Sequence, residues 1–168
     1  QMLGLPTLAV IHRFGKSRDS YPQRLITYHA PGSPISEPYR TLRTNLLFST
    51  NGGWSKGAYI VTSPGPSEGK SVTVANLAVT MAMAGLRVLL VDADLRRPRM
   101  HEIFNLPNNV GLSTLLSADP NEVSAEISRG GMPQNLLECL QDTEIPGLRV
   151  ISSGFLPLNP TEVLGSIA

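Results

Sequence analysis

The residues with the clearest chemistry are Gly69, Lys70 and Ser71, which close a loop rich in glycine and proline that begins at Pro64. Backbone N–H groups in a tight loop between a strand and a helix can form a concave site for an anion. The unpaired N–H groups and the positive dipole end of the following helix attract negative charge to the same place. A lysine and a hydroxyl there suit phosphate and Mg²⁺, so the sequence predicts a nucleotide site, with ATP or ADP and Mg²⁺ as ligands.

The residues expected to contact the nucleotide form one continuous run. Lys70 should reach the β- and γ-phosphates, and Ser71 should bind Mg²⁺ through its hydroxyl oxygen. The generic pattern has a glycine where this chain has Pro64, so a plain turn between a strand and a helix is the alternative. The predicted nucleotide-binding residues are Gly65, Pro66, Ser67, Glu68, Gly69, Lys70, Ser71 and Val72.

Two carboxylates, Asp92 and Asp94, stand at the end of an apolar run that starts at Val88 and is typical of a central parallel strand. Ligands of open parallel sheets bind beyond the C-terminal ends of the strands. We therefore expect Lys70, Asp92 and Asp94 to be catalytic, with one carboxylate accepting a proton from an attacking hydroxyl. The expected metal ligands are Ser71, Asp92 and Asp94. In the alternative, Asp92 caps the next turn and Asp94 faces solvent.

The elements that must position these residues alternate between strand and helix, which predicts an α/β fold with a parallel sheet. Ser36 is expected to cap the first long helix, and Gly85 to end the second. Polar residues 15–34 are expected to form a loop. Expected strands cover residues 5–11, 58–63, 88–92 and 148–152, and expected helices cover 36–48, 70–84, 99–104, 112–117, parts of 120–140 and a last helix from 161.

Composition excludes several other classes of protein. A length of 168 residues suits one domain with its own core. The net charge is +1, and the only basic run is Arg96, Arg97 and Arg99, so no nucleic-acid partner is expected. The single cysteine, Cys139, excludes a disulfide within the chain. No apolar run is long enough to span a bilayer.

The two motifs together resemble those of the bacterial tyrosine kinases of capsule and exopolysaccharide synthesis, which are deviant-Walker P-loop ATPases related to MinD and ParA. SPGPSEGKS and VLLVDADLRRPRMHEIF carry the resemblance, supported by SPISEPYRTLRTNL, GLSTLLS and SGFLPLNPTEVLGS. It implies a three-layer P-loop NTPase fold, with a mainly parallel sheet flanked by helices. It also implies that Asp92 activates an acceptor tyrosine and that Asp94 helps to hold Mg²⁺. Gly65 stands where MinD-type ATPases have a second lysine, which favours the kinase branch.

The resemblance also implies partners and a location. Glu37, Arg40 and Arg43 recur at helical spacing in a stretch that contacts the neighbouring subunit of a ring-shaped oligomer in this family. A solvated helix face with local ion pairs is the alternative. Residues 3–11 resemble the juxtamembrane piece of forms fused to a Wzz-type membrane adaptor, which is a separate chain in others. Residues 1–34 would then be a juxtamembrane linker with a short strand, and residues 35–168 the N-terminal part of the kinase domain.

This reading places the protein at the cytoplasmic face of the bacterial inner membrane, acting with polysaccharide export and polymerase machinery. Its implied activity is phosphorylation, in trans, of a tyrosine-rich tail. The family's Walker B strand should follow the helix that begins near Thr161, with the tail further on, so these residues are expected to be part of a longer protein. Two other functions stay open: a MinD/ParA-like ATPase that transfers phosphate to water, and a non-catalytic module whose bound nucleotide sets the oligomeric state.

Overall fold

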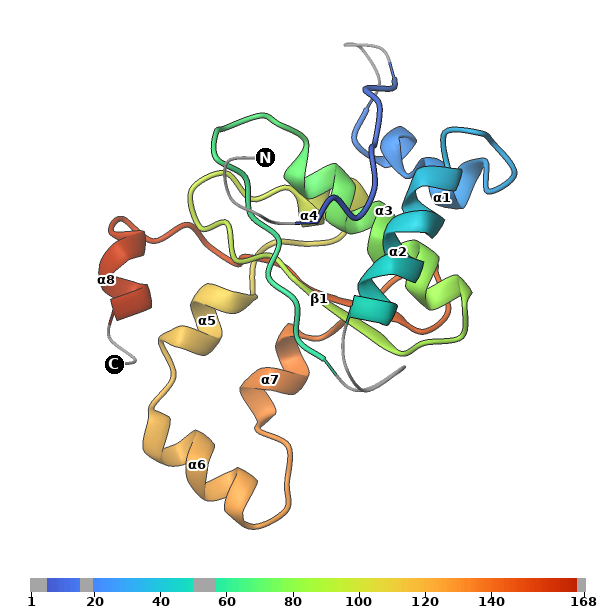
Figure 1. Ribbon diagram of the computed structural model, residues 1–168. Coiled ribbons are helices and arrows are strands. Elements are labelled where there is room, and N and C mark those ends of the chain that lie inside the picture. The colour runs from blue at the N-terminus through green and yellow to red at the C-terminus, as the bar shows by residue number, and fades with distance from the viewer. Residues whose placement is uncertain (1–5, 16–19, 50–56, 166–168) are drawn as a thin grey trace. The chain divides into compact units, whose positions relative to one another are not determined.

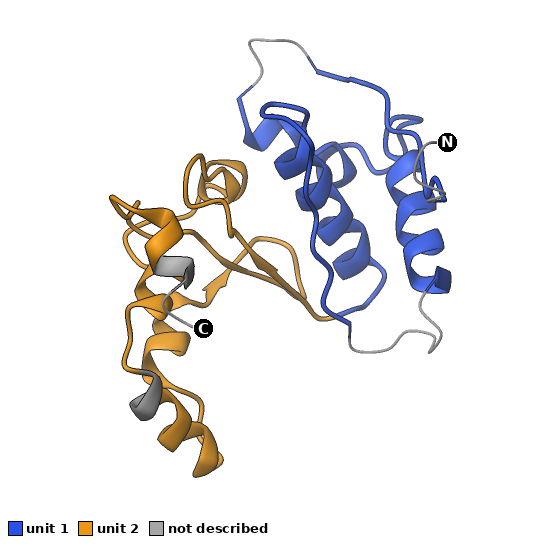
Figure 2. Ribbon diagram, turned by 60° about the vertical axis from the view of Figure 1, so that its left-hand side comes forward, with its two compact units in different colours: residues 1–86 blue, residues 87–168 orange. Residues whose placement is uncertain are grey.

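The chain divides into two compact units, residues 1–86 and residues 87–168 (Figure 2). The computed structural model describes residues 6–15, 20–49 and 57–165 (Figure 1). Across these described ranges, no helix is both long enough and apolar enough to cross a membrane.

The first unit is built from helices. A short 3-10 helix, η1 (Pro22–Arg24), precedes α1 (Ile26–His29), α2 (Glu37–Ser49) and α3 (Lys70–Met83). Figure 1 shows α1 and α2 lying alongside α3, and both contact it. The middle of α3 is buried because small side chains such as Ala75 and Ala78 let the neighbouring helices approach closely.

One glycine ends α3, and one asparagine on α3 holds a neighbouring segment against it. Gly85, at a left-handed φ of 85°, donates its N–H to the Ala82 carbonyl and ends the helix, as the sequence predicts. The buried Asn76 amide oxygen accepts from the backbone N–H and the hydroxyl of Thr27, at 3.0 and 2.8 Å. Its Nδ2 donates to the Arg24 carbonyl at 2.9 Å, so one side chain attaches the η1–α1 segment to α3.

The second unit contains a mixed, three-stranded sheet. Strands β1 (Val88–Val91) and β3 (Leu148–Ile151) pair in parallel, and β2 (Gln141–Asp142) pairs antiparallel with β3, which gives the order β1-β3-β2. The helices of this unit are α4 (Met100–Phe104), α5 (Leu112–Leu116), α6 (Pro120–Ser128), α7 (Gln134–Cys139) and α8 (Pro160–Gly165). Helix α5 contacts both α7 and α8.

Two expected strands are wrong in this structure. Residues 58–63 are irregular and largely exposed, with Ile60 at 95% exposure, and residues 6–11 are irregular too, while residue 5 lies outside the described residues. A strand is held by hydrogen bonds to a neighbouring strand, and no described strand pairs with either segment. Apolar and β-branched composition alone therefore did not make a strand at these two places.

The region expected to be a loop, residues 15–34, instead contains η1 and α1. The expected helix start at Ser36 is nearly right, because α2 begins at Glu37 with Pro38 in its first turn. The Ser36 hydroxyl does not cap the helix, however. It is buried and donates to the Ala30 carbonyl at 2.8 Å and to the Ile26 carbonyl at 3.2 Å, which secures the preceding loop.

Candidate nucleotide site

The loop of residues 64–71 leads directly into the first turn of α3. Gly69 precedes the helix at φ 94°, and its carbonyl accepts the first helical hydrogen bond, from the Thr73 N–H at 2.8 Å. A Cβ at Gly69 would meet no atom within 4 Å, so the left-handed φ, and not lack of space, is what favours glycine there. Glycine offers no side-chain cap at the start of α3, and the N–H groups of a helix start are suited to bind an anion.

Ser67 also lies in the left-handed region, at φ 61°. A non-glycine residue in this region costs about 1–3 kcal/mol, a kind of strain that clusters at binding sites. Together, Ser67 and Gly69 turn the backbone so that the loop is exposed while Lys70 and Ser71 are half-buried.

The carboxylate of Asp92 organises the segment that follows β1. Its residue is only 4% exposed, and its backbone N–H donates to the Ile151 carbonyl at 2.9 Å. Oδ2 accepts the N–H groups of Arg99 and Met100, both at 2.9 Å, and Oδ1 accepts the N–H of Asp94 at 3.2 Å. Arg99 and Met100 stand at the start of α4, so their bonds to Oδ2 mean that Asp92 does cap the next turn. This structural role leaves the catalytic role a prediction.

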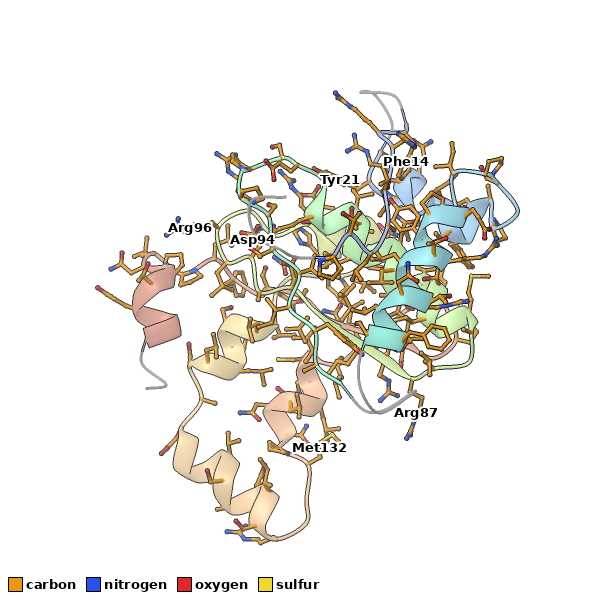
Figure 3. All side chains as sticks on the ribbon, in the orientation of Figure 1. Phe14, Tyr21, Arg87, Asp94, Arg96 and Met132 are labelled. Atoms are coloured by element: carbon orange, nitrogen blue, oxygen red, sulfur yellow. The ribbon has the colours of Figure 1, made fainter. Side chains whose placement is uncertain are left out.

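Asp94 holds the next turn in the same way. Its Oδ1 accepts the backbone N–H groups of Arg96 at 3.2 Å and Arg97 at 2.9 Å, and Figure 3 shows Asp94 and Arg96 close together. Asp94 is half-buried. Oxygen ligands of this kind, with the Ser71 hydroxyl, match the preference of Mg²⁺. The residues present therefore fit the expected metal.

The parallel pairing of β1 with β3 brings a second group of residues to the edge where Asp92 lies. Val91 is level with Ile151, so Asp92 and the buried Ser152 leave the sheet at the same end. The Ser152 hydroxyl donates to the Val110 carbonyl at 3.0 Å, and its own carbonyl accepts from Leu112 at 2.8 Å. This network is not among the features predicted from the sequence.

Gly111 allows the close approach in that network. A Cβ at this position would lie 2.2 Å from the Ser152 carbonyl oxygen and 2.4 Å from the Gly154 nitrogen. Cys139 packs against Gly111, with its Sγ 3.3 Å from the Gly111 carbonyl oxygen. Burial, and to a smaller extent the nearby charge of Glu138, raises the pKa of the Cys139 thiol. The glycine ahead of α5 and the Ser-Ser-Gly run after β3 are the signals that could have pointed to this contact.

The charged side chains of α2 make mostly local contacts. Arg40 pairs with Glu37 at 2.7 Å, one turn away, and also donates through Nη2 to the Pro31 carbonyl. Arg43 reaches α3 and donates through Nη1 to the Thr80 carbonyl at 2.9 Å. The local ion pair of the alternative reading is thus present for Glu37 and Arg40, and the contact with a neighbouring subunit stays a prediction.

The predicted site residues fall into both units. The loop of residues 64–71 belongs to the first unit, and Asp92 and Asp94 belong to the second. Within the first unit, the structure brings Lys70 and Ser71 to the start of α3, and within the second it brings Asp92 and Asp94 to the C-terminal end of β1. Each group of predicted site residues is therefore positioned within its own unit.

Comparison with known proteins identifies the domain family that contains the loop of residues 64–71 and both aspartates. The family model described as the CobQ/CobB/MinD/ParA nucleotide binding domain matches residues 59–143, which is half of the chain. The matched range contains the loop of residues 64–71 and both aspartates, Asp92 and Asp94. The match confirms a P-loop NTPase-like α/β fold that binds nucleotides.

Two curated relatives show which kind of protein within this family the chain is similar to. The chain is 41% identical over 152 residues to tyrosine-protein kinase YwqD of Bacillus subtilis, covering 90% of this chain and 58% of the relative. It is 37% identical to the putative tyrosine-protein kinase CapB of Staphylococcus aureus, covering 84% of this chain and 56% of the relative. The chain thus spans somewhat more than half the length of these relatives.

The crystal structure of the chimerical protein CapA2B2 is 39% identical to the chain, with a TM-score of 0.75, and the match covers 97% of this chain and 62% of that one. This likeness and the names of the two relatives confirm the resemblance to bacterial tyrosine kinases. Because the domain model spans half of the residues and both motifs, the chain belongs to the CobQ/CobB/MinD/ParA nucleotide-binding domain family.

Proposed function

We propose that this chain is the nucleotide-binding part of an ATP-dependent protein-tyrosine kinase that regulates the synthesis and export of capsular or extracellular polysaccharide. The loop of residues 64–71 carries the proposal, because Ser67 and Gly69 turn its exposed backbone into the start of α3, where Lys70 and Ser71 lie. Relatives named tyrosine-protein kinases support the class of reaction.

In this proposal, the first unit holds the phosphates. The N–H groups of the loop and of the first turn of α3 bind phosphate oxygens, and the Lys70 ammonium contacts the β- and γ-phosphates. Ser71 and Asp94 are the residues that would hold Mg²⁺, which when bound neutralises charge that develops on the phosphates.

Asp92 is the proposed proton acceptor. Its Oδ2 accepts two N–H groups but its Oδ1 accepts one, from Asp94, so Oδ1 keeps a lone pair for a proton. The tyrosine oxygen attacks the γ-phosphorus, the bond from that phosphorus to the bridging oxygen breaks, and ADP leaves. The tyrosine hydroxyl proton passes to Asp92 Oδ1.

The partners of the proposed kinase and its place in the cell belong to the same proposal. We propose that it assembles with copies of itself through α2, with Glu37, Arg40 and Arg43 at the contact, and phosphorylates tyrosines of a neighbouring copy. Residues 1–34 would link this domain to a Wzz-type adaptor, fused or separate, at the cytoplasmic face of the membrane. The charged, partly exposed surface of α2 supports such a contact.

The test is incubation of the natural gene product that contains these residues with Mg²⁺ and ATP labelled at the γ-phosphate, followed by acid hydrolysis to amino acids. Label in phosphotyrosine is the expected result. Release of labelled inorganic phosphate alone would instead indicate an ATPase, and nucleotide binding without either product would indicate a non-catalytic module.

Substitution of the proposed phosphate ligand checks that the label arises at this site. Lys70→Met should abolish both nucleotide binding and phosphotyrosine, because the ammonium that contacts the phosphates is lost. Arg87→Met, which removes an exposed cation outside the loop, is the matched control and should keep full labelling. Undiminished labelling in Lys70→Met would contradict the assignment of the loop.

A further inference from the structure

The turn that follows β1 carries a basic run for which the proposed reaction has no role. Asp92 closes this turn at both ends. Its Oδ1 accepts the N–H of Asp94, and its Oδ2 accepts the N–H groups of Arg99 and Met100. Residues 95–98 therefore form a loop that is closed on the carboxylate of Asp92, the proposed proton acceptor.

The loop buries its two apolar residues and exposes its two arginines. Leu95 is 3% exposed and Pro98 is buried, whereas Arg96 and Arg97 are both exposed. The Asp94 carboxylate accepts the backbone N–H groups of both arginines, at 3.2 and 2.9 Å, and Arg96 stands beside Asp94 in Figure 3. Two guanidinium groups are thus presented to solvent from a backbone that hydrogen bonds hold in place.

Arg96 and Arg97 differ from the third arginine of the run in their ion pairs. Arg99 pairs with Glu102, three residues further on. Across the part of the chain that the structure describes, neither Arg96 nor Arg97 forms an ion pair. Two neighbouring cations without counter-charges repel one another, and an anionic partner would relieve that repulsion.

The proposed reaction brings a polypeptide to this loop. The acceptor tyrosine gives its proton to Asp92 Oδ1, so the residues on either side of that tyrosine pass over the loop that Asp92 closes. An extended chain rises about 3.3 Å per residue, which puts positions two or three residues from the tyrosine about 7–10 Å away from it. Acidic side chains at those positions come within reach of the long arginine side chains on the loop.

We infer that Arg96 and Arg97 select acceptor tyrosines that are flanked by acidic residues. This inference rests on the proposed kinase function. A guanidinium presents paired N–H donors that match the two oxygens of a carboxylate. The carboxylates of Asp92 and Asp94 and the phosphates of the nucleotide repel an acidic polypeptide, and the two arginines offset that repulsion. They determine specificity and take no part in the transfer itself.

The test compares two synthetic peptides as substrates of the natural gene product, with Mg²⁺ and ATP at constant ionic strength. Each peptide has a single tyrosine, flanked by glutamates in one and by glutamines at the same positions in the other. The kcat/KM of the glutamate peptide should be higher by a factor of about ten or more, because a hydrogen bond between charged groups is worth at least that.

The double variant Arg96→Gln/Arg97→Gln should lower this ratio of kcat/KM values to near one. Arg87→Gln is the matched control, because it removes an exposed cation of the same unit outside the loop, and it should keep the full ratio. A ratio near one in the unchanged protein, an equal fall in Arg87→Gln, or an effect of the double variant on the KM for ATP and not on that for the peptide would each overturn the inference.

A binding measurement separates this inference from the kinase activity. The same two peptides with phenylalanine in place of tyrosine cannot be phosphorylated, and fluorescence anisotropy follows their binding in the presence of Mg²⁺ and ADP. The glutamate peptide should bind more tightly by a factor of about ten or more, and this difference should vanish in the double variant. That result without any phosphotyrosine would count against the kinase and not against acidic recognition. Equal binding of the two peptides would overturn the recognition, whether or not phosphotyrosine forms.

Discussion

The carboxylate of Asp92 accepts three backbone N–H groups, through both of its oxygens. Asp92→Asn would turn an amide NH₂ toward at least one of these donors and leave it unsatisfied in a buried place. We expect the free energy of unfolding in urea to fall by about 1–3 kcal/mol. A loss of phosphotyrosine in this variant therefore has to be measured where the variant is still folded.

Asp94→Asn is the matched control for that experiment. The N–H bonds from Arg96 and Arg97 to its side chain both end on Oδ1, which asparagine retains. Its free energy of unfolding should fall by less than that of Asp92→Asn. Equal stability of the two variants would show that the bonds to Asp92 do not hold the segment between β1 and α4.

The buried phenol of Tyr39 on α2 should make the free energy of unfolding depend on pH above pH 10. It is 1% exposed, its ring meets Phe14 edge to face at 6.2 Å, and burial raises its pKa from 10.0 to about 12, opposed by a hydrogen bond with the Thr73 side chain. Between pH 10 and 12 the unfolded chain loses this proton and the folded chain keeps it, so the stability that is present below pH 10 falls as pH rises.

The measurement is the free energy of unfolding from pH 9 to 12, in the unchanged chain and in Tyr39→Phe. The phenylalanine variant keeps the ring contact but has no proton to lose, so its stability should decline less steeply in this range. Parallel curves for the two proteins would refute the inference that the buried phenol resists ionisation.

At the scale of elements, the contact between the residues ahead of α5 and those after β3 depends on Gly111. In Gly111→Ala the new methyl group would collide with the backbone of Ser152 and Gly154, which cannot move aside as a flexible side chain can. The free energy of unfolding should fall by about 3 kcal/mol, the upper part of the usual range for overpacking.

Gly32→Ala is the control for that prediction, because a Cβ at Gly32 would meet no atom within 4 Å. Its stability in a denaturant titration should be unchanged or slightly higher, since alanine restricts the unfolded chain. A Gly111→Ala variant as stable as Gly32→Ala would mean that the two segments do not lie as close as described.

The sequence predicts those elements whose signals are local. Helices α2 and α3 and strands β1 and β3 lie within a few residues of their expected bounds, because apolar patterning and end signals such as Gly85 act within the segment itself. Residues 58–63 have the same apolar composition as a strand, yet strand formation also needs a partner, which local sequence does not specify. The hydrogen bonds of Asn76 with Thr27 join residues 49 positions apart, beyond any periodicity.

The candidate site shows the same division. The loop at Lys70 and the acidic pair at Asp92 are visible in sequence because their chemistry depends on residue type and spacing. The left-handed Ser67 and the three N–H groups on Asp92 are properties of the folded backbone, and residue types do not reveal them. These two features show why the motifs are held in one conformation.

For the whole molecule, the central claim is that this chain binds Mg-ATP through the loop of residues 64–71 and the carboxylates of Asp92 and Asp94. The domain family, whose model spans the loop and both aspartates, is consistent with this claim. Nucleotide should then raise the free energy of unfolding of the chain, because a ligand that binds only the folded state stabilises it.

Titration calorimetry of the protein with ATP, with and without Mg²⁺, tests this claim most directly. We predict saturable binding of one nucleotide per chain that weakens when Mg²⁺ is removed and also weakens in Asp94→Asn, which keeps the fold. Binding of ATP that is indifferent to both Mg²⁺ and Asp94, or no binding at all, would contradict the account.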